Sequence, residues 1–475
     1  MKRTRGILLS AVICSLALVA MACGSDDNDT SPTTDTSPTT TTTAAEPDKP
    51  PADLGVDAPD TTDAPDSTDA PATTGAPVAT TAAPTTTVAP PSPTTGFDGD
   101  TITLGYLTDE SGGLAIVGIP LRDGAEVYWE WVNQNQGGVA GQYRVELLVA
   151  DTQDDPAQSI TEYQRIKDDV VMFAEVLSTP PTQALVEFLR EDNIVAVPGS
   201  LAGAWAGEAV LLPNGAAYEY EMINLVNWYA DESGLASTDD VYCAVHVDDK
   251  YGNDSMRGVT FATEELGIEL SETQTINRGD TDFTAQVSAM DDAGCTVVYA
   301  VTVPSEQNGM LAQADAIGFN PTWLGALPSY LNLFAGGRPD LYSNFYVAID
   351  SPNLNDTSVP AMADFLSRFE EINGGTPNTF HLSGYFQSIA VHALLEKAVE
   401  LGDLSRDGIA TAMAQLGEVD NGGLAAENYV YGLPEDRVPT SAVRIFKFDR
   451  DQPPNFLNEI QVYDSPLNDS FPLLG

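Results

Sequence analysis

The sequence predicts an α/β protein of two lobes, in which each lobe holds a parallel β-sheet between layers of helices. From residue 101 onward, short apolar stretches typical of strands alternate with stretches of helical spacing. This alternation forms two series that separate near residues 213–217. A chain of 475 residues is long enough for two domains. Repeated strand–helix alternation is typical of parallel sheets that carry helices on both faces.

The first series begins at residues 101–107, where polar and apolar residues alternate as in a half-buried strand. Residues 117–132 follow, with apolar side chains near helical spacing. The same patterns predict the rest of this series: a strand at 145–150, a helix at 157–169, a strand at 170–177, a helix at 180–192 and a strand at 194–198.

The second series repeats this order. It comprises helix 217–233, strand 241–247, helix 253–266, strand 268–276, helix 282–293, strand 296–302, helix 307–317 and strands 322–326 and 344–349. Two later helical stretches, 358–373 and 380–401, have no place in this series. These two stretches would have a place if the chain returned to the first lobe.

Residues 1–22 have the composition of a secretory signal peptide. Lys2, Arg3 and Arg5 precede an apolar run, and small residues then lead to Cys23. This arrangement is similar to a bacterial lipobox, which implies cleavage before Cys23 and lipidation of that cysteine. An ordinary secretory signal with an unmodified Cys23 is the alternative. A membrane-spanning helix is disfavoured, because the run is shorter than about 20 residues.

Residues 23–97 are predicted to form a disordered tether. Thr and Pro supply 34 of the 74 residues from 24 to 97, and Phe97 is the single aromatic residue among them. With so few apolar side chains, burial cannot offset the entropy that is lost on ordering. Such a segment would hold a folded domain away from a membrane surface.

The net charge of −50, from 70 acidic and 20 basic residues, excludes several classes of partner. Residues 98–475 alone carry 58 acidic and 16 basic residues, so the charge belongs mostly to the folded part. Such a surface repels nucleic acid phosphates and anionic lipid headgroups. No nucleic acid partner is therefore expected.

Two cysteines remain in the predicted folded part after Cys14 leaves with the signal peptide and Cys23 is lipidated. Cys243 and Cys295 both lie in strand-like runs. An extracytoplasmic setting is oxidising, so a disulfide between them is predicted. Two buried free thiols are the alternative.

Ligands of open α/β sheets bind beyond the carboxyl ends of the strands. Ser178 and Thr179 follow one predicted strand and open a helix, whose free N–H groups favour an anion. Gly199 and Ser200 follow the next strand, with Trp205 nearby. The corresponding segments of the second lobe are Asp248–Gly252 and Val303–Glu306.

Several motifs, in this order and spacing, resemble the type I periplasmic binding proteins, in the branch of the Leu/Ile/Val-binding proteins. They are Ser111–Gly118, Asn133–Gly141, Asp151–Pro156, Thr182–Gln183, Asp248–Gly252 and Ala314–Gly318. The resemblance covers about 101–450. It implies two Rossmann-like lobes, three crossover segments and a ligand cleft that closes by hinge motion. The first lobe would comprise 98–213 and 347–430, and the second 214–346 and 431–475.

The resemblance also implies the ligand-binding residues. In members that bind amino acids, a hydroxyl and backbone N–H groups hold the ligand carboxylate. Thr179 stands at the hydroxyl position, and the backbone positions are Ser200, Leu201 and Ala202. Tyr251 and Phe380 match two aromatic positions of the family. The remaining candidates at or near the cleft are Ser111, Ser178, Trp205 and Pro304, with Tyr330 and Val117 as further wall positions.

Three positions depart from the family pattern. The tyrosine after the strand at 296–302 is replaced, with Pro304 nearby, and Val117 stands where another aromatic is common. The acid that usually holds the α-amine of the ligand falls at Leu327. A buried ammonium without a carboxylate is unfavourable. Either the ligand lacks the amine, or Asp109, Glu110 or Glu306 supplies the charge.

Catalysis is not predicted. The chain contains no G-x-S-x-G, P-loop or H-E-x-x-H motif. Of the three histidines, His246 and His392 fit packing positions, whereas His381 is near enough to Phe380 to contact a ligand. No metal or cofactor is expected.

The sequence thus predicts a monomeric solute-binding lipoprotein on the outer face of the cell membrane. It would capture an amino acid or a related polar or amphipathic compound and deliver it to the permease of an ABC importer. Two alternatives stay open: a sensor of the same fold that signals to a membrane receptor, and a surface interaction protein with a degenerate cleft.

Overall fold

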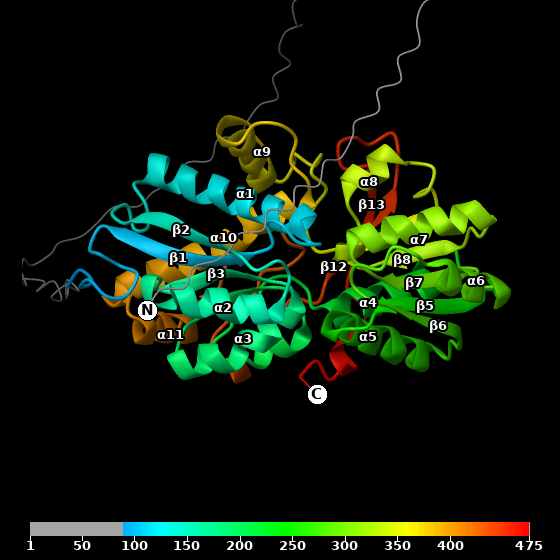
Figure 1. Ribbon diagram of the computed structural model, residues 1–475, viewed down its shortest axis with the longest axis horizontal. Coiled ribbons are helices and arrows are strands. Elements are labelled where there is room, and N and C mark those ends of the chain that lie inside the picture. The colour runs from blue at the N-terminus through cyan, green and yellow to red at the C-terminus, as the bar shows by residue number, and fades with distance from the viewer. Residues whose placement is uncertain (1–88, 475) are drawn as a thin grey trace, which may run out of the picture. The chain divides into compact units, whose positions relative to one another are not determined.

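A computed structural model describes residues 89–474 of the chain. This part folds into two α/β lobes (Figure 1), which confirms the predicted fold class. The predicted signal peptide, Cys23 and most of the predicted tether lie outside the described residues. Within residues 89–474, no helix is long and apolar enough to cross a membrane.

The first lobe combines an N-terminal βα series with helices from much later in the chain. Its strands are β1 (Thr101–Thr108), β2 (Arg144–Asp151), β3 (Met172–Leu177) and β4 (Ala196–Gly199). Its helices are α1 (Ala115–Trp131), α2 (Pro156–Ile166), α3 (Thr179–Asp192), α9 (Pro360–Ile372), α10 (Thr379–Leu401) and α11 (Arg406–Ala414). The strands are all parallel, in the order β2–β1–β3–β4. Helices α2 and α3 cover one face of the sheet, and α1 and α10 pack together on the other.

The second lobe has a larger, mixed sheet. Its strands are β5 (Tyr242–Val247), β6 (Leu270–Ile276), β7 (Val297–Val301), β8 (Thr322–Gly325), β9 (Phe345–Ile349), β12 (Val443–Phe448) and β13 (Leu457–Tyr463). Its helices are α4 (Tyr218–Asn227), α5 (Lys250–Leu266), α6 (Thr284–Asp292), α7 (Pro304–Ile317) and α8 (Asn332–Gly337). Five strands are parallel, and β12 and β13 add an antiparallel edge. The two faces carry α4 and α5, and α6 and α7.

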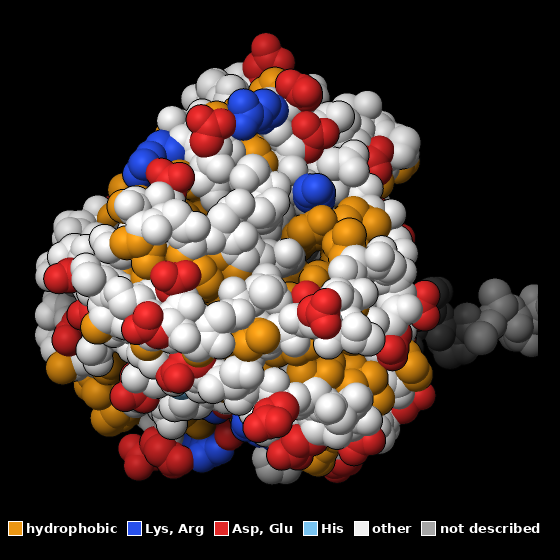
Figure 2. Space-filling view, turned by 90° about the vertical axis from the view of Figure 1, so that its right-hand side faces the viewer, with side chains coloured by type: hydrophobic (Ala, Val, Ile, Leu, Met, Phe, Trp, Pro, Cys, Tyr) orange, Lys and Arg blue, Asp and Glu red, His pale blue; other side chains and the backbone are white. Residues whose placement is uncertain are grey.

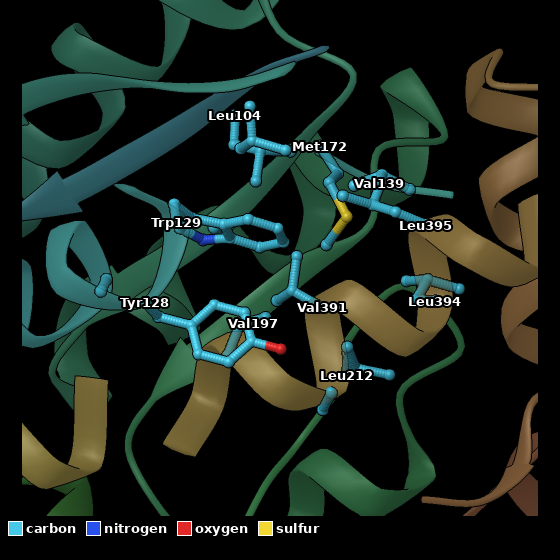
Figure 3. Packing of buried hydrophobic residues seen from close by; sticks show 14 of the residues in the cluster. Leu104, Tyr128, Trp129, Val139, Met172, Val197, Leu212, Val391, Leu394 and Leu395 are labelled. Atoms are coloured by element: carbon cyan, nitrogen blue, oxygen red, sulfur yellow. The ribbon is translucent and has the colours of Figure 1, made fainter. Parts of the chain in front are cut away.

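The core of the first lobe joins residues that are distant in sequence. Leu104 and Met172 project from β1 and β3 onto Trp129 of α1 and Val391 and Leu395 of α10 (Figure 3). All five side chains are buried. Helix α10 is therefore the element that returns from the second lobe to complete this core, as the sequence predicted for 380–401.

The chain passes between the lobes at residues 213–217, 350–353 and 439–442. Contacts tie the first two crossing segments to each other and the first one to β11 (Val430–Tyr431). The carboxylate of Asp350 accepts hydrogen bonds from the backbone N–H groups of Ala216 and Ser351. The hydroxyl of Tyr431 donates to Oδ1 of Asn214 at 2.7 Å. Any movement of one lobe relative to the other must therefore change these contacts.

The structure places three lobe boundaries differently from the sequence analysis. Phe97, which was assigned to the tether, is 2% exposed and packs edge-on against Tyr143. The boundary between 346 and 347 would divide β9, which lies entirely in the sheet of the second lobe. Tyr431 lies in β11 (Val430–Tyr431), which pairs with β10 (Gly417–Glu418), so the last crossing comes later. The boundary between 346 and 347 was misplaced because the sequence of a strand that precedes a crossing segment does not differ from that of any other strand.

Cys243 and Cys295 form a disulfide with a Cα–Cα separation of 5.9 Å. Cys243 lies in β5, and Cys295 directly precedes the neighbouring strand β7. Both residues are buried with α6 and α7 in one hydrophobic cluster. The disulfide therefore covalently links β5 to the start of the adjacent strand β7 in the second lobe.

Candidate ligand-binding site between the lobes

A cavity of about 800 Å³, counted to its open mouth, is lined by residues of both lobes and of the crossing segments. The first lobe contributes Leu114, Val117, Leu121, Leu177, Ser178, Thr179, Gly199, Ser200, Leu201, Phe380, Ser383, Phe386 and Gln387. The second lobe contributes Tyr218, Tyr251, Arg278, Val303, Pro304, Leu327 and Pro328, and the crossings contribute Asn214, Gly215 and Asp350. These segments meet because the carboxyl ends of parallel strands share one edge of each sheet.

The N-terminus of α3 forms one polar wall of the cavity. Ser178 occupies the N-cap position with φ 81°, and it makes no side-chain cap to the helix. Two prolines in the first turn lack N–H groups, which fits a helix start. Ser178 is 5% exposed, and its hydroxyl has no hydrogen bond of normal geometry. Burial raises the pKa of the neighbouring Asp154 carboxyl, and Arg278 and the Ser178 hydroxyl oppose that rise. A ligand oxygen at this end would meet a free hydroxyl and the positive end of a helix dipole.

The loop after β4 continues the same wall. Gly199 and Ser200 line the cavity, and the Ser200 hydroxyl accepts a hydrogen bond from the indole Nε1 of Trp205 at 2.7 Å. Trp205 is 3% exposed and lies behind this loop, outside the cavity lining. Its role is to orient the Ser200 side chain.

Two tyrosines of the second lobe pack edge to face in the cavity wall. The rings of Tyr218 and Tyr251 are 4.7 Å apart between centroids. The Tyr251 hydroxyl donates to the carbonyl of Thr302 at 3.0 Å, and burial raises its pKa well above the ordinary value. Tyr251 therefore contributes an aromatic surface, since its hydroxyl is already satisfied.

Arg278, which follows β6, places a cation at the cavity wall. Its Nε contacts Oδ2 of Asp249 at 2.6 Å, and its Nη1 contacts Oδ2 of Asp154 at 3.2 Å. Asp249 caps α5 in the second lobe, whereas Asp154 belongs to the loop after β2 in the first lobe. The Arg278–Asp154 pair therefore connects the two lobes directly at the cavity.

Most of the cavity wall is apolar. Leu114, Val117 and Leu121 project from α1 and pack with Leu327 and Phe380 around one hydrophobic cluster that spans both lobes. Such a wall excludes water from the bound part of a ligand and favours aliphatic or aromatic surface.

Two buried carboxyl groups lie near this apolar wall. Asp350 lines the cavity, and burial raises its pKa to about 6. Glu221 of α4 lies behind the wall, and its Oε2 accepts a hydrogen bond from the backbone N–H of Leu327 at 3.2 Å. Burial, together with Asp350, raises the pKa of Glu221 well above its usual range. Burial thus disfavours the charged form of both carboxyl groups.

Eight of the eleven ligand residues predicted from the sequence lie in this cavity wall: Ser178, Thr179, Ser200, Leu201, Tyr251, Pro304, Leu327 and Phe380. Three do not. Ser111 donates to Oδ2 of Asp151 in an exposed loop, whereas Ala202 and Trp205 are buried behind the wall. Val117 also lines the cavity, but Tyr330 points elsewhere and donates to the carbonyl of Asn455.

The acids proposed as substitutes for position 327 do not line the cavity. Asp109 accepts hydrogen bonds from the backbone N–H groups of Ser111, Gly112 and Leu114. Glu110 contacts Arg122, and Glu306 accepts the N–H of Gly279. Asp350 was missed, although the rule of looking after each strand would have found it, because it directly follows β9.

The histidines have structural roles. His381 closes a capping box with Asn378 at the start of α10, and burial lowers its pKa to about 4. It does not line the cavity, although its place beside Phe380 had allowed a ligand contact. His392 packs beside Tyr128, whose hydroxyl lies 2.8 Å from its Nδ1. Among residues 89–474, no group of three or more His, Cys, Asp or Glu side chains could hold a metal ion.

Comparisons with known proteins agree with this architecture. A model of the periplasmic binding protein family matches residues 101–453. The leucine-, isoleucine-, valine-, threonine- and alanine-binding protein of Pseudomonas aeruginosa is 27% identical over 232 residues, which are 48% of this chain and 60% of that relative. The chain thus matches less than two thirds of that relative's length. Leu/Ile/Val-binding protein homolog 7 of Brucella suis is 25% identical over 62% of this chain and 77% of its own.

Solved structures show the same fold. A fatty acid ABC transporter substrate-binding protein from Thermomonospora curvata superposes with a TM-score of 0.74 at 24% identity, over 81% of this chain and 96% of that one. A branched-chain amino acid ABC transporter protein from Thermus thermophilus with bound valine gives a TM-score of 0.67 at 16% identity, over 78% and 98%. The chain therefore belongs to the periplasmic binding protein family, in the type I branch that includes the Leu/Ile/Val-binding proteins.

Proposed function

We propose that this protein is an extracytoplasmic solute-binding lipoprotein that captures a small amphipathic solute between its lobes and delivers it to an ABC importer. The observation that carries this proposal is the interlobe cavity itself. It joins hydroxyl groups, a helix N-terminus and a guanidinium to a wall of aliphatic and aromatic side chains. Such a cavity buries an amphipathic solute and fixes its orientation.

The relatives support a solute of this chemistry. The Pseudomonas relative is named for binding five amino acids, and the Thermomonospora neighbour for a fatty acid transporter. Both ligand classes join a carboxylate to an aliphatic part. Closure of the lobes would bring Thr179 of the first lobe and Tyr251 of the second against the same solute.

The cellular setting follows from the N-terminal sequence. In this proposal Cys23 carries the lipid, and the Thr- and Pro-rich segment after it spaces the binding domain from the membrane. The partner at the membrane is the permease of the importer. Replacement of Cys23 by Ala is expected to release the protein into the medium, which immunoblotting of cell and medium fractions would detect.

The experiment that tests solute binding begins with the purified protein. Mass spectrometry of small molecules that are released on denaturation should find a bound solute. A thermal-shift panel of amino acids, amides and short organic acids should raise the melting temperature for one chemical class. No co-purified solute and no stabilisation by any member would contradict the proposal.

A matched pair of variants locates the site. Thr179→Val removes a hydroxyl from the cavity wall and should weaken the binding of the stabilising solute about tenfold, as expected for a lost hydrogen bond to a charged group. Thr161→Val removes an exposed hydroxyl that bonds within α2, and it should leave affinity unchanged. Equal affinities of both variants and the wild type would place the solute elsewhere.

A further inference from the structure

We propose that the cavity selects a monocarboxylate with an aliphatic or aryl body and without an ammonium group beside the carboxylate. This inference rests on the proposed solute-binding function and narrows it to one ligand class. It follows from three features of the cavity: a built anion site, an apolar surface in place of an acid, and a neighbouring carboxylate that is already engaged by the backbone.

The anion site has more than a helix N-terminus. The Ser178 hydroxyl at the start of α3 lies in the cavity wall, is 95% buried by residue and makes no hydrogen bond of normal geometry. Arg278 is the single Lys or Arg among the described residues that line the cavity. A carboxylate here would accept hydrogen bonds from the Ser178 hydroxyl and from the N–H of Thr179, and it would lie near the Arg278 guanidinium, which also contacts Asp154 and Asp249.

The position beside Leu327 does not suit an ammonium group. The Leu327 side chain is part of the apolar wall, and its backbone N–H already donates to Glu221. Glu221 is fully buried behind this wall and does not line the cavity, and burial raises its pKa well above the usual range. An ammonium placed against this wall would lose its hydration without gaining a counter-ion.

Asp350 is the one acidic side chain among the described lining residues, but the crossing segments already hold it. Its carboxylate accepts the backbone N–H groups of Ala216 and Ser351. It also lies so close to Gly215 that a Cβ atom there would be 2.4 Å from Oδ2. Gly215 has φ +73°, which together with this close approach explains a glycine at that position. Asp350 therefore fastens the crossings to one another.

The apolar part of the cavity wall favours a ligand with an aliphatic or aryl body. The apolar residues from α1, α10 and the second lobe continue along this space. Each further buried CH₂ group of a ligand would gain about 0.8 kcal/mol.

Four compounds that share one carbon skeleton test the inference. They are leucine, 4-methylpentanoate (which lacks the ammonium), 3-methylbutylamine (which lacks the carboxylate) and 4-methylpentanamide (which is uncharged). Isothermal titration of protein that has been freed of bound small molecules should show 4-methylpentanoate binding at least tenfold more tightly than leucine. The amine and the amide should bind more weakly than 4-methylpentanoate, and octanoate more tightly. Leucine or the amine binding as tightly as 4-methylpentanoate would overturn the proposal.

Variants at two wall positions, with one control, separate the alternatives. Leu327→Glu restores an acid to the wall, so leucine should then bind more tightly than 4-methylpentanoate. Leu333→Glu places the same acid at a residue that is 67% exposed and outside the cavity wall, so it should keep the wild-type preference. If the wild type binds leucine and Asp350→Asn abolishes that binding, then Asp350 is an ammonium partner and the proposal is wrong.

The failure of this inference is distinguishable from the failure of the proposed function. If a solute that bears an ammonium beside its carboxylate, or that lacks a carboxylate, co-purifies and rebinds in the cavity, solute binding stands and the ligand class is overturned. If an ammonium-free carboxylate co-purifies, both are supported. If no compound co-purifies or binds, both fail.

Discussion

The Asp350 carboxyl has two roles: it lines the cavity, and it holds two crossing segments together. Its folded-state pKa is about 6, above the value of about 3.9 for an unfolded chain. The folded protein therefore binds this proton more tightly than the unfolded chain does. The resulting stabilisation is complete below about pH 4 and is lost as the pH rises through about 6.

We predict that Asp350→Asn reduces the dependence of stability on pH. Between pH 4.5 and 7, the wild-type free energy of unfolding should fall by about 2 kcal/mol more than that of the variant, at about 1.4 kcal/mol for each pKa unit. Urea unfolding of ligand-free protein at both pH values measures this difference. Asp340→Asn is the control, since that side chain is 88% exposed. An unchanged pH dependence in Asp350→Asn would contradict the assignment.

At the residue scale, the sequence predicted the uncharged residues of the cavity wall better than its charged residues. Ser178, Thr179 and Ser200 could be found because they follow strands, and a strand end lies at the binding edge of a sheet. Arg278 and Asp350 also follow strands but were missed. Their roles depend on groups in other segments, namely Asp154 for Arg278 and Ala216 for Asp350, and sequence spacing does not reveal such pairings.

At the element scale, the loops after β2 and β6 meet through the Arg278–Asp154 pair. Both side chains are mostly buried, with exposures of 23% and 10%, so solvent screens this pair less than a surface pair. The pair favours the conformation in which the two lobes are close at the cavity. An anionic ligand beside Ser178 would lie near the same guanidinium.

We predict that Asp154→Asn shifts the ligand-free protein toward an open arrangement of the lobes. The radius of gyration from small-angle X-ray scattering should rise, because one direct interlobe contact is lost. Glu208→Gln is the control, since Glu208 pairs with Arg190 within the first lobe. A lower melting temperature with no change in the radius of gyration would show instead that Asp154 stabilises its own lobe.

The disulfide between β5 and the start of β7 should contribute to the stability of the second lobe. It closes a segment of 52 residues, for which the loss of chain entropy in the unfolded state corresponds to roughly 4 kcal/mol. The double variant Cys243→Ala, Cys295→Ala is therefore expected to lower the free energy of unfolding by about 2–4 kcal/mol in chemical denaturation. Ligand affinity should change little, because both cysteines lie in the cluster with α6 and α7 and not in the cavity wall. Unchanged stability would contradict this role.

Helices and strands of the two series could be predicted closely because each shows a clear period of apolar residues. The antiparallel strands β12 and β13 were not predicted. In β13, exposed and half-buried residues alternate, and Ile460 and Val462 are exposed, so the strand lacks the apolar run of the central strands. Helix α10 was predicted as a helix, but its place in the first lobe came from the need to complete that lobe.

At the scale of the whole molecule, the acidic character is a property of the surface. Acidic side chains are scattered over the face shown in Figure 2, and basic ones are few. The buried acids Glu175, Glu221 and Asp350 are different, since burial raises the pKa of each. The net charge therefore favours solubility and does not identify the ligand, whereas the cavity wall does carry that information.

The late return of α10 also has a consequence for the order in which the protein can be made. Strand β4 ends at Gly199, whereas α10 begins at Thr379, about 180 residues later along the chain. During synthesis from the N-terminus, the face of the first sheet that α10 covers stays open until the parallel strands of the second lobe have been produced. A nascent chain that stops before Thr379 would thus display uncovered apolar sheet and be prone to aggregation. The first lobe therefore cannot finish folding until most of the chain has emerged, although its strands are made first.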